Sequence, residues 1–86
     1  MRINGIEQGM LAKSKAGHDK GHVYVIYEVD ETYVYLVDGK KRPLKKPKKK
    51  KRKHVQIICQ RQELSNIDDV GIKRMLKLFD KEARRI

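Results

Sequence analysis

The chain has 86 residues and a formal net charge of +11, with 38% hydrophobic and 38% charged residues. A chain of this length has room for one small domain and buries too little surface for two cores or a deep catalytic cleft. A single cysteine excludes an internal disulfide. The sequence shows neither a signal-peptide pattern nor the run of about 18 apolar residues that spans a bilayer. We therefore expect a cytoplasmic protein without a membrane partner.

Half of the positive charge lies in residues 40–54, KKRPLKKPKKKKRKH. This segment holds 11 of the 22 Lys and Arg residues and none of the 11 Asp and Glu residues, so the other 71 residues carry 11 charges of each sign. An unopposed cationic block gains free energy when it releases counterions from a polyanion. The segment therefore predicts polyanion binding. A solvated charge run that improves solubility and a nuclear import signal at residues 47–53 are the alternatives.

The first third of the chain predicts two strands. Residues 1–8 show no periodicity and are expected to be a flexible lead-in, and residues 9–14 have the length and mixed polarity of a first strand. Residues 15–21 contain two glycines and an Asp, which favour a tight loop. The run HVYVIYEV at residues 22–29 is rich in β-branched and aromatic residues and predicts the second strand.

Three more strands are expected after it. Residues 33–37 predict the third strand, and Asp38-Gly39 after it is a hairpin signal. Residues 41–44 are expected to form a short edge strand, where a proline is tolerated. We expect the rest of the basic segment at 40–54 to be an exposed loop, because it has no apolar residue to bury. Residues 55–59 then predict the fifth strand.

These strands predict a mainly β fold, with a barrel over residues 9–60 and a helix within residues 61–86. Five short strands with one apolar face each must curl to remove their edges, which favours a small SH3-like five-stranded barrel over an OB-type one. A C-terminal amphipathic α-helix over residues 66–85 is expected from helical spacing, with Ser65 and Asp68 resembling a capping box. The apolar stripe comprises Ile72, Met75, Leu76, Phe79 and Ala83. It can pack on the barrel or bind a second protein.

The segment QGMLAKSKAGHDKGHVYVI, residues 8–26, resembles the KOW motif: a Gly opening an alternating strand, an Asp-Lys-Gly loop and a second alternating strand. The continuation LVDGKKRPLKKPKKK, residues 36–50, followed by KHV at 53–55, is similar to short bacterial KOW-domain RNA-binding proteins related to large-subunit ribosomal proteins of archaea and eukaryotes. The resemblance covers about residues 8–58. It implies an SH3-like fold of the KOW type and association with RNA or with ribonucleoprotein machinery, with ribosomal RNA the expected partner. It leaves open whether the chain is a ribosome component, an assembly factor or a more loosely associated protein.

Positive charge and this resemblance together define the expected nucleic-acid-binding residues. Most are lysines, which act as hydrated point charges, so they would contact phosphates rather than read bases. The loop at 15–22 would add contacts beside its backbone N–H groups, or it is a plain structural turn. The tyrosines could stack on bases or fill the barrel. The expected binding residues are Lys13, Lys15, His18, Lys20, Lys40, Lys41, Arg42, Lys45, Lys46, Lys48, Lys49, Lys50, Lys51, Arg52, Lys53 and His54.

Catalysis, metals and cofactors find no support in the pattern, so we expect a protein that is not an enzyme. His18 and His22 are spaced as H-x3-H, but no cysteine pair completes a zinc site. Cys59 and His54 are five positions apart, which in a strand places them on opposite faces. A protein-interaction module that bridges components of a transcription or translation complex is the second functional hypothesis. The oligomeric state is left open.

Overall fold

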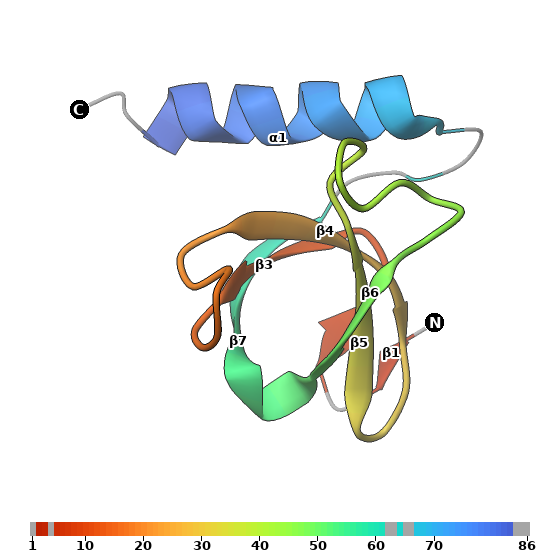
Figure 1. The fold of residues 1–86 in the computed structure, drawn as a ribbon, viewed down its shortest axis with the longest axis vertical. Helices are drawn as coiled ribbons and strands as arrows, with labels where there is room; N and C mark the ends of the chain where they lie inside the picture. The colour runs from red at the N-terminus through yellow and green to blue at the C-terminus, as the bar shows by residue number, and fades with distance from the viewer. Residues whose placement is uncertain (1, 4, 62–63, 65–66, 84–86) are drawn as a thin grey trace.

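The computed structural model describes residues 2–3, 5–61, 64 and 67–83. One sheet of five antiparallel strands curls into a partly open barrel, with strand order β6-β5-β4-β3-β7, so that the last strand returns beside β3 (Figure 1). Its strands are β3 (Met10–Ser14), β4 (Val23–Val29), β5 (Tyr33–Val37), β6 (Lys48–Lys51) and β7 (Val55–Arg61), and helix α1 (Asp69–Ala83) follows them. The predicted fold class, a small SH3-like barrel with a C-terminal helix, is confirmed.

Strand β4 is covered on both of its faces. Tyr24 and Ile26 point into the barrel and belong to its main core, whereas Val25 lies on the outer face. A register shift between Ile26 and Glu28, opposite β5, interrupts the alternation, so Val29 joins the inner core. Burial on both faces explains why this strand is almost continuously apolar in sequence rather than strictly alternating.

Helix α1 packs on the outer face of the barrel, across β4 (Figure 1). Ile72 is fully buried in a cluster with Val25 and Val37, so this part of the apolar stripe is used within the chain. The helix begins at Asp69 rather than residue 66, and the Asp68 carboxylate accepts a 2.8 Å hydrogen bond from the Gly71 N–H. Asp68 is thus the N-cap itself. The other member of the expected capping box, Ser65, lies outside the described residues.

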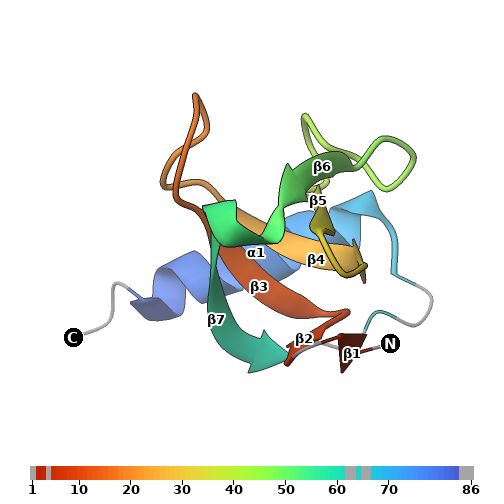
Figure 2. The same cartoon turned by 90° about the horizontal axis from the view of Figure 1, so that it is seen from below.

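The N-terminal segment has more structure than its sequence indicates. Strands β1 (Arg2–Ile3) and β2 (Ile6–Glu7) pair as a small antiparallel sheet, and Ile6 is buried in the barrel core. Figure 2 shows this sheet at the end of the barrel opposite the two long loops. Within the expected lead-in, Arg2–Ile3 and Ile6–Glu7 therefore form strands, and Ile6 contributes to the barrel core.

The basic segment departs from two predictions. Residues 41–44 are not an edge strand but turns in a loop, and Asp38-Gly39 opens that ten-residue loop (38–47) rather than a tight hairpin. The edge strand lies further on: β6, Lys48–Lys51, consists only of lysines and pairs with β5, and a 3-10 turn, Arg52–His54, connects it to β7. The expectation of an exposed loop for the rest of the segment is therefore wrong at residues 48–51, which form β6.

Candidate nucleic-acid interface

Two loops project from the same end of the barrel. Figure 2 shows the loop at residues 15–22 and the loop at 38–47 rising from this end, with β6 and the 3-10 turn nearby. Most of the predicted binding residues lie in these loops or in β6. The fold therefore brings cations that are separated in sequence to one end of the molecule, opposite β1 and β2.

Strand β6 divides its four lysines between two faces. Lys48 and Lys50 lie opposite Leu36 and Val34, both of which are fully buried, so these two lysines share the inner face of the sheet. Lys49 and Lys51 alternate with them and are exposed on the outer face. Four identical residues thus have two different structural roles, because successive side chains of a strand point to opposite faces of the sheet.

Both inner lysines form ion pairs with Asp19. The Nζ atoms of Lys48 and Lys50 each lie 2.9 Å from one of its carboxylate oxygens. The same carboxylate accepts a 2.8 Å hydrogen bond from the Ser14 hydroxyl and a 2.7 Å hydrogen bond from the Tyr24 hydroxyl. The Lys50 ammonium also donates to the Ala16 carbonyl oxygen at 2.9 Å. The Lys48 and Lys50 side chains are only 26% and 10% exposed. Both are therefore structural cations that attach the loop at 15–22 to β6.

The pKa of the Asp19 carboxyl reflects this network. Burial by itself raises the pKa, but the hydrogen bonds from Lys50, Tyr24, Lys48 and Ser14 outweigh burial and hold it far below its usual range. Burial and the bond to Asp19 correspondingly raise the pKa of the Tyr24 hydroxyl. Asp19 is thus a permanent anion at neutral pH, although the sequence indicated only a turn residue.

A second aspartate organises the loop at 38–47. Oδ1 of the buried Asp38 accepts the backbone N–H groups of Lys40 at 2.8 Å and Arg42 at 2.9 Å, and Oδ2 lies 3.1 Å from His22 Nε2. Burial raises the pKa of Asp38, but these partners outweigh it and lower the pKa overall. Within the expected edge strand at 41–44, the Arg42 N–H is thus bonded to Asp38, and the Leu44 N–H donates to Asp69 Oδ1 at 2.7 Å. Side-chain carboxylates therefore take backbone N–H groups that a strand could otherwise use for pairing.

Tyrosines lie on both faces of the sheet. Tyr24 is buried in the core. Tyr33 is half-buried on the outer face, where the Lys49 ammonium lies 4.2 Å from its ring centroid. Tyr35 is also half-buried there and donates a 3.0 Å hydrogen bond to Asp30. The outer face of β5 and β6 thus combines two partly accessible aromatic rings with the exposed ammonium groups of Lys49 and Lys51.

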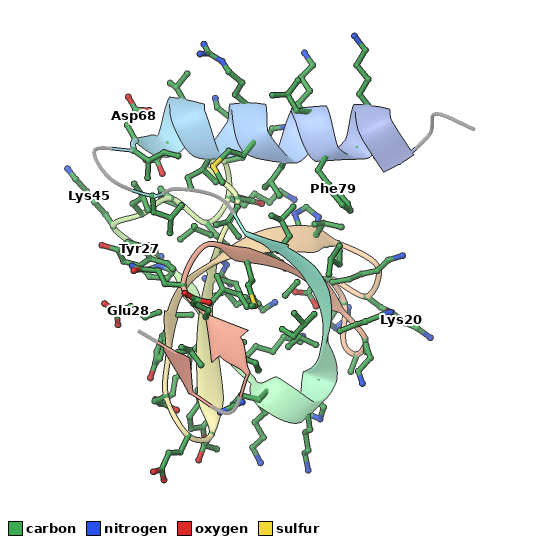
Figure 3. All side chains as sticks on the ribbon, turned by 180° about the vertical axis from the view of Figure 1, so that it is seen from behind. Lys20, Tyr27, Glu28, Lys45, Asp68 and Phe79 are labelled. Carbon is green, nitrogen blue, oxygen red and sulfur yellow. The ribbon has the colours of Figure 1, made fainter. Side chains whose placement is uncertain are left out.

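The sixteen predicted binding residues separate by exposure. The exposed ones are Lys13, Lys15, His18, Lys20, Lys40, Lys41, Lys45, Lys46, Lys49, Lys51 and Lys53, and the half-buried ones are Arg42, Lys48, Lys50, Arg52 and His54. Figure 3 shows Lys20 and Lys45 on opposite sides of the molecule, so the exposed cations do not form one compact cluster. They are spread around the loop end of the barrel, and an extended polyanion fits them better than a single phosphate.

Three cations that the sequence interpretation omitted lie near this surface. Lys73, Arg74 and Lys77 of α1 line a groove together with Lys40 of the basic segment. Nothing in their spacing relates them to residue 40, because the two segments are joined only by the docking of the helix. Helical periodicity places Lys73 and Lys77 on one side of α1, which is the only sequence signal that concerns them.

The described residues give little support for a metal site or a membrane-spanning helix. No three His, Cys, Asp or Glu side chains within them gather as a metal ion requires, and His22 is paired with Asp38. The side chain of Cys59 lies outside the described part of the chain. None of the helices described here is both long and apolar enough to cross a membrane.

The chain is thus a small barrel with one exposed basic end, and the two inner lysines of β6 are ion-paired with Asp19. Comparison of the chain with protein-family models and with curated proteins finds no match.

Proposed function

We propose that the chain binds RNA through the exposed lysines at the loop end of its barrel, with ribosomal RNA as the expected target in the cytoplasm. The observation that carries this proposal is that seven of the eleven Lys and Arg residues at 40–54 are exposed, in a segment without an acidic residue. These are Lys40, Lys41, Lys45, Lys46, Lys49, Lys51 and Lys53. A surface of this kind supports contact with closely spaced phosphates.

The resemblance to the KOW motif supports this proposal and also suggests which class of RNA-binding protein the chain represents. The Asp-Lys-Gly of residues 19–21 carries part of the resemblance, and in this chain its Asp19 is bonded to Lys48 and Lys50. We therefore place the chain among KOW-domain RNA-binding proteins as part of the proposal. A role in ribosomes or in their assembly follows from that placement.

A protein-bridging function has less support. It depends on the apolar stripe of the C-terminal helix, and the first residue of that stripe, Ile72, is fully buried against the barrel. Val70 and Leu78 are exposed at 55% each, but isolated apolar side chains on a surface are ordinary. RNA binding is therefore the function that these observations favour.

Salt dependence tests the proposal. If about six phosphates are engaged, affinity for a structured ribosomal RNA fragment should fall about a thousandfold between about 50 and about 200 mM salt. Converting Lys49, Lys51 and Lys53 to Gln should reduce the log–log slope by about 2–3, because each contact contributes about 0.7–0.9. Converting the same three residues to Arg keeps the charge and should preserve the slope. A shallow slope for the natural chain, or Gln and Arg variants that bind equally, would contradict RNA binding through these lysines.

A further inference from the structure

A groove of about 720 Å3 runs between helix α1 and the barrel. Its barrel side comprises residues 21–23 with Asp38 and Lys40, and its other side is formed by α1 from Val70 to Asp80. The volume is within the range of about 300–1,000 Å3 that is typical of small-ligand sites. The groove adjoins the loop at 38–47, so it continues the basic surface described above onto the helix.

Cations predominate along this groove. Lys40, Lys73, Arg74 and Lys77 all line it and are all exposed. Its carboxylates are Asp38 and Asp80, and both already interact within the chain. Asp38 accepts two backbone N–H groups, as described above, and Asp80 also has a partner. With four cations and two carboxylates in its lining, the groove carries net positive charge, and its natural occupant is anionic.

The floor of the groove is apolar. Val23 of β4 and Leu76 and Phe79 of α1 line it and are half-buried. Figure 3 shows Phe79 pointing from the helix toward the strands. An aromatic ring beside aliphatic groups accommodates the face of a nucleobase, because base stacking tolerates any base and needs no hydrogen-bond partner. Cations at the rim with an aromatic floor are the combination that binds single-stranded nucleic acid.

We propose that this groove binds an unpaired stretch of RNA, with phosphates on Lys40, Lys73 and Lys77 and one base against Phe79. The inference rests on the proposed function and adds to it a second contact region on the helix, for single-stranded rather than folded RNA. An acidic protein segment would also find cations here. RNA is assigned because Lys40 belongs to the acid-free segment at 40–54, so one continuous strand can contact both surfaces.

The test compares two RNA probes, a blunt hairpin and the same hairpin with a single-stranded extension. A variant with Lys73→Gln and Lys77→Gln should bind the extended probe about tenfold more weakly, with a salt slope lower by about 1.4, because single-stranded contacts contribute about 0.7 each. Its affinity for the blunt hairpin should be unchanged. Lys81→Gln changes a charge on the same helix outside the groove and is expected to bind both probes as the natural chain does.

Phe79 tests the apolar part of the inference. Phe79→Leu should weaken binding of the extended probe about tenfold without changing the salt slope, because it removes a stacking surface but no charge. Phe79→Tyr keeps an aromatic ring and should restore binding. A residue that only supported the helix would lower affinity for both probes. Thermal unfolding of each variant confirms that the fold is retained.

The outcomes separate the two proposals. If the natural chain binds neither probe, the proposed RNA-binding function itself fails. If it binds both probes and the groove variants bind them equally well, the function stands and the groove inference is overturned. If poly-glutamate binds the natural chain but not the Lys73→Gln and Lys77→Gln variant, while RNA binding is unaffected by these changes, the groove is a site for an acidic protein segment and the inference is again overturned.

Discussion

Asp19 and Lys50, which are 31 positions apart in the sequence, form a 2.9 Å ion pair that joins the loop after β3 to the edge strand β6. Their side chains are 14% and 10% exposed, so the pair is largely shielded from solvent. This contact shows that a segment of unusually high positive charge also contains lysines with a structural role. It leads to predictions that separate stability from RNA binding.

Removal of the Asp19 charge should destabilise the barrel. In Asp19→Asn, two poorly exposed ammonium groups lose their counterion, and we expect the free energy of unfolding to fall by about 2–4 kcal/mol. Urea denaturation measures this loss. Glu31→Gln removes the same charge at an exposed turn and should change stability by less than about 0.5 kcal/mol. Equal effects of the two substitutions would show that the Asp19 network is energetically unimportant.

Neighbouring lysines of β6 should behave differently. Lys50→Gln breaks the network with Asp19 and should lower stability by about 2 kcal/mol while leaving the salt slope of RNA binding unchanged. Lys51→Gln alters an exposed side chain and should do the opposite, reducing the slope by about 0.7–0.9 with little effect on stability. Urea denaturation and RNA titration on both proteins provide the comparison. If Lys50→Gln lowers the slope as much as Lys51→Gln does, the inner lysines also contact RNA.

Acid should weaken the fold through Asp19 and Asp38. Both carboxyls have a pKa lowered by folding, because hydrogen bonds from their partners outweigh burial. A lowered folded-state pKa gives stability that is present above the unfolded pKa of about 3.9 and is lost as the pH falls through the folded value. Unfolding free energy measured from about pH 6 down to about pH 2 should therefore decline below about pH 4. In Asp38→Asn this decline should be shallower, and an identical decline would exclude Asp38 as a contributor.

Gly39 should be essential for docking of the helix. Its φ is +77°, and a Cβ atom there would lie 2.9 Å from Lys73 Cγ and closer still to the Asp69 carbonyl oxygen. Gly39→Ala should therefore cost more than about 2 kcal/mol, from backbone strain together with displacement of α1. Gly21→Ala is the matched control, because Gly21 has a φ of +91° but open space around it. It should cost only about 1 kcal/mol.

Hydrogen exchange distinguishes the two glycine substitutions further. Displacement of α1 should accelerate exchange of the helix amides in Gly39→Ala, including that of Ile72, which donates to the Asp68 carbonyl oxygen at 3.0 Å. The same amides should remain protected in Gly21→Ala. Equal protection in both variants would mean that the helix tolerates a side chain at position 39.

Four of the five barrel strands could be predicted because their residues bury apolar side chains. Strand β6 could not, since Lys48–Lys51 has no apolar residue, and its inner face is satisfied by an aspartate about thirty positions earlier in the chain. The error at 41–44 has a related cause, because the Arg42 N–H donates to Asp38 and the Leu44 N–H donates to Asp69 rather than to a neighbouring strand. In both places the backbone conformation depends on a long-range or side-chain interaction, and the local sequence pattern does not indicate such interactions.

The sequence shows where the basic residues are concentrated, but it does not show which of them are exposed in the fold. Charge counting cannot distinguish the exposed Lys49 from the half-buried Lys50. The two side chains differ in exposure because they lie on opposite faces of a strand, and the sequence pattern does not predict that strand. Nor could it connect the helix cations Lys73 and Lys77 with Lys40, because that proximity depends on how α1 docks. Ile72, buried against the barrel, Gly39, which lies close to the Asp69 carbonyl oxygen, and the bond from the Leu44 N–H to Asp69 all contribute to that docking.

The all-lysine composition of β6 also has a consequence for self-association. An unpaired strand at the edge of a sheet is a template onto which another chain can add, and this is a route to fibrils. Here that edge carries outward ammonium groups at alternate positions, so a second copy approaching in the same way meets like charge. The outward lysines of β6 should thus also disfavour edge-to-edge aggregation, and this protection should weaken wherever a bound polyanion neutralises them.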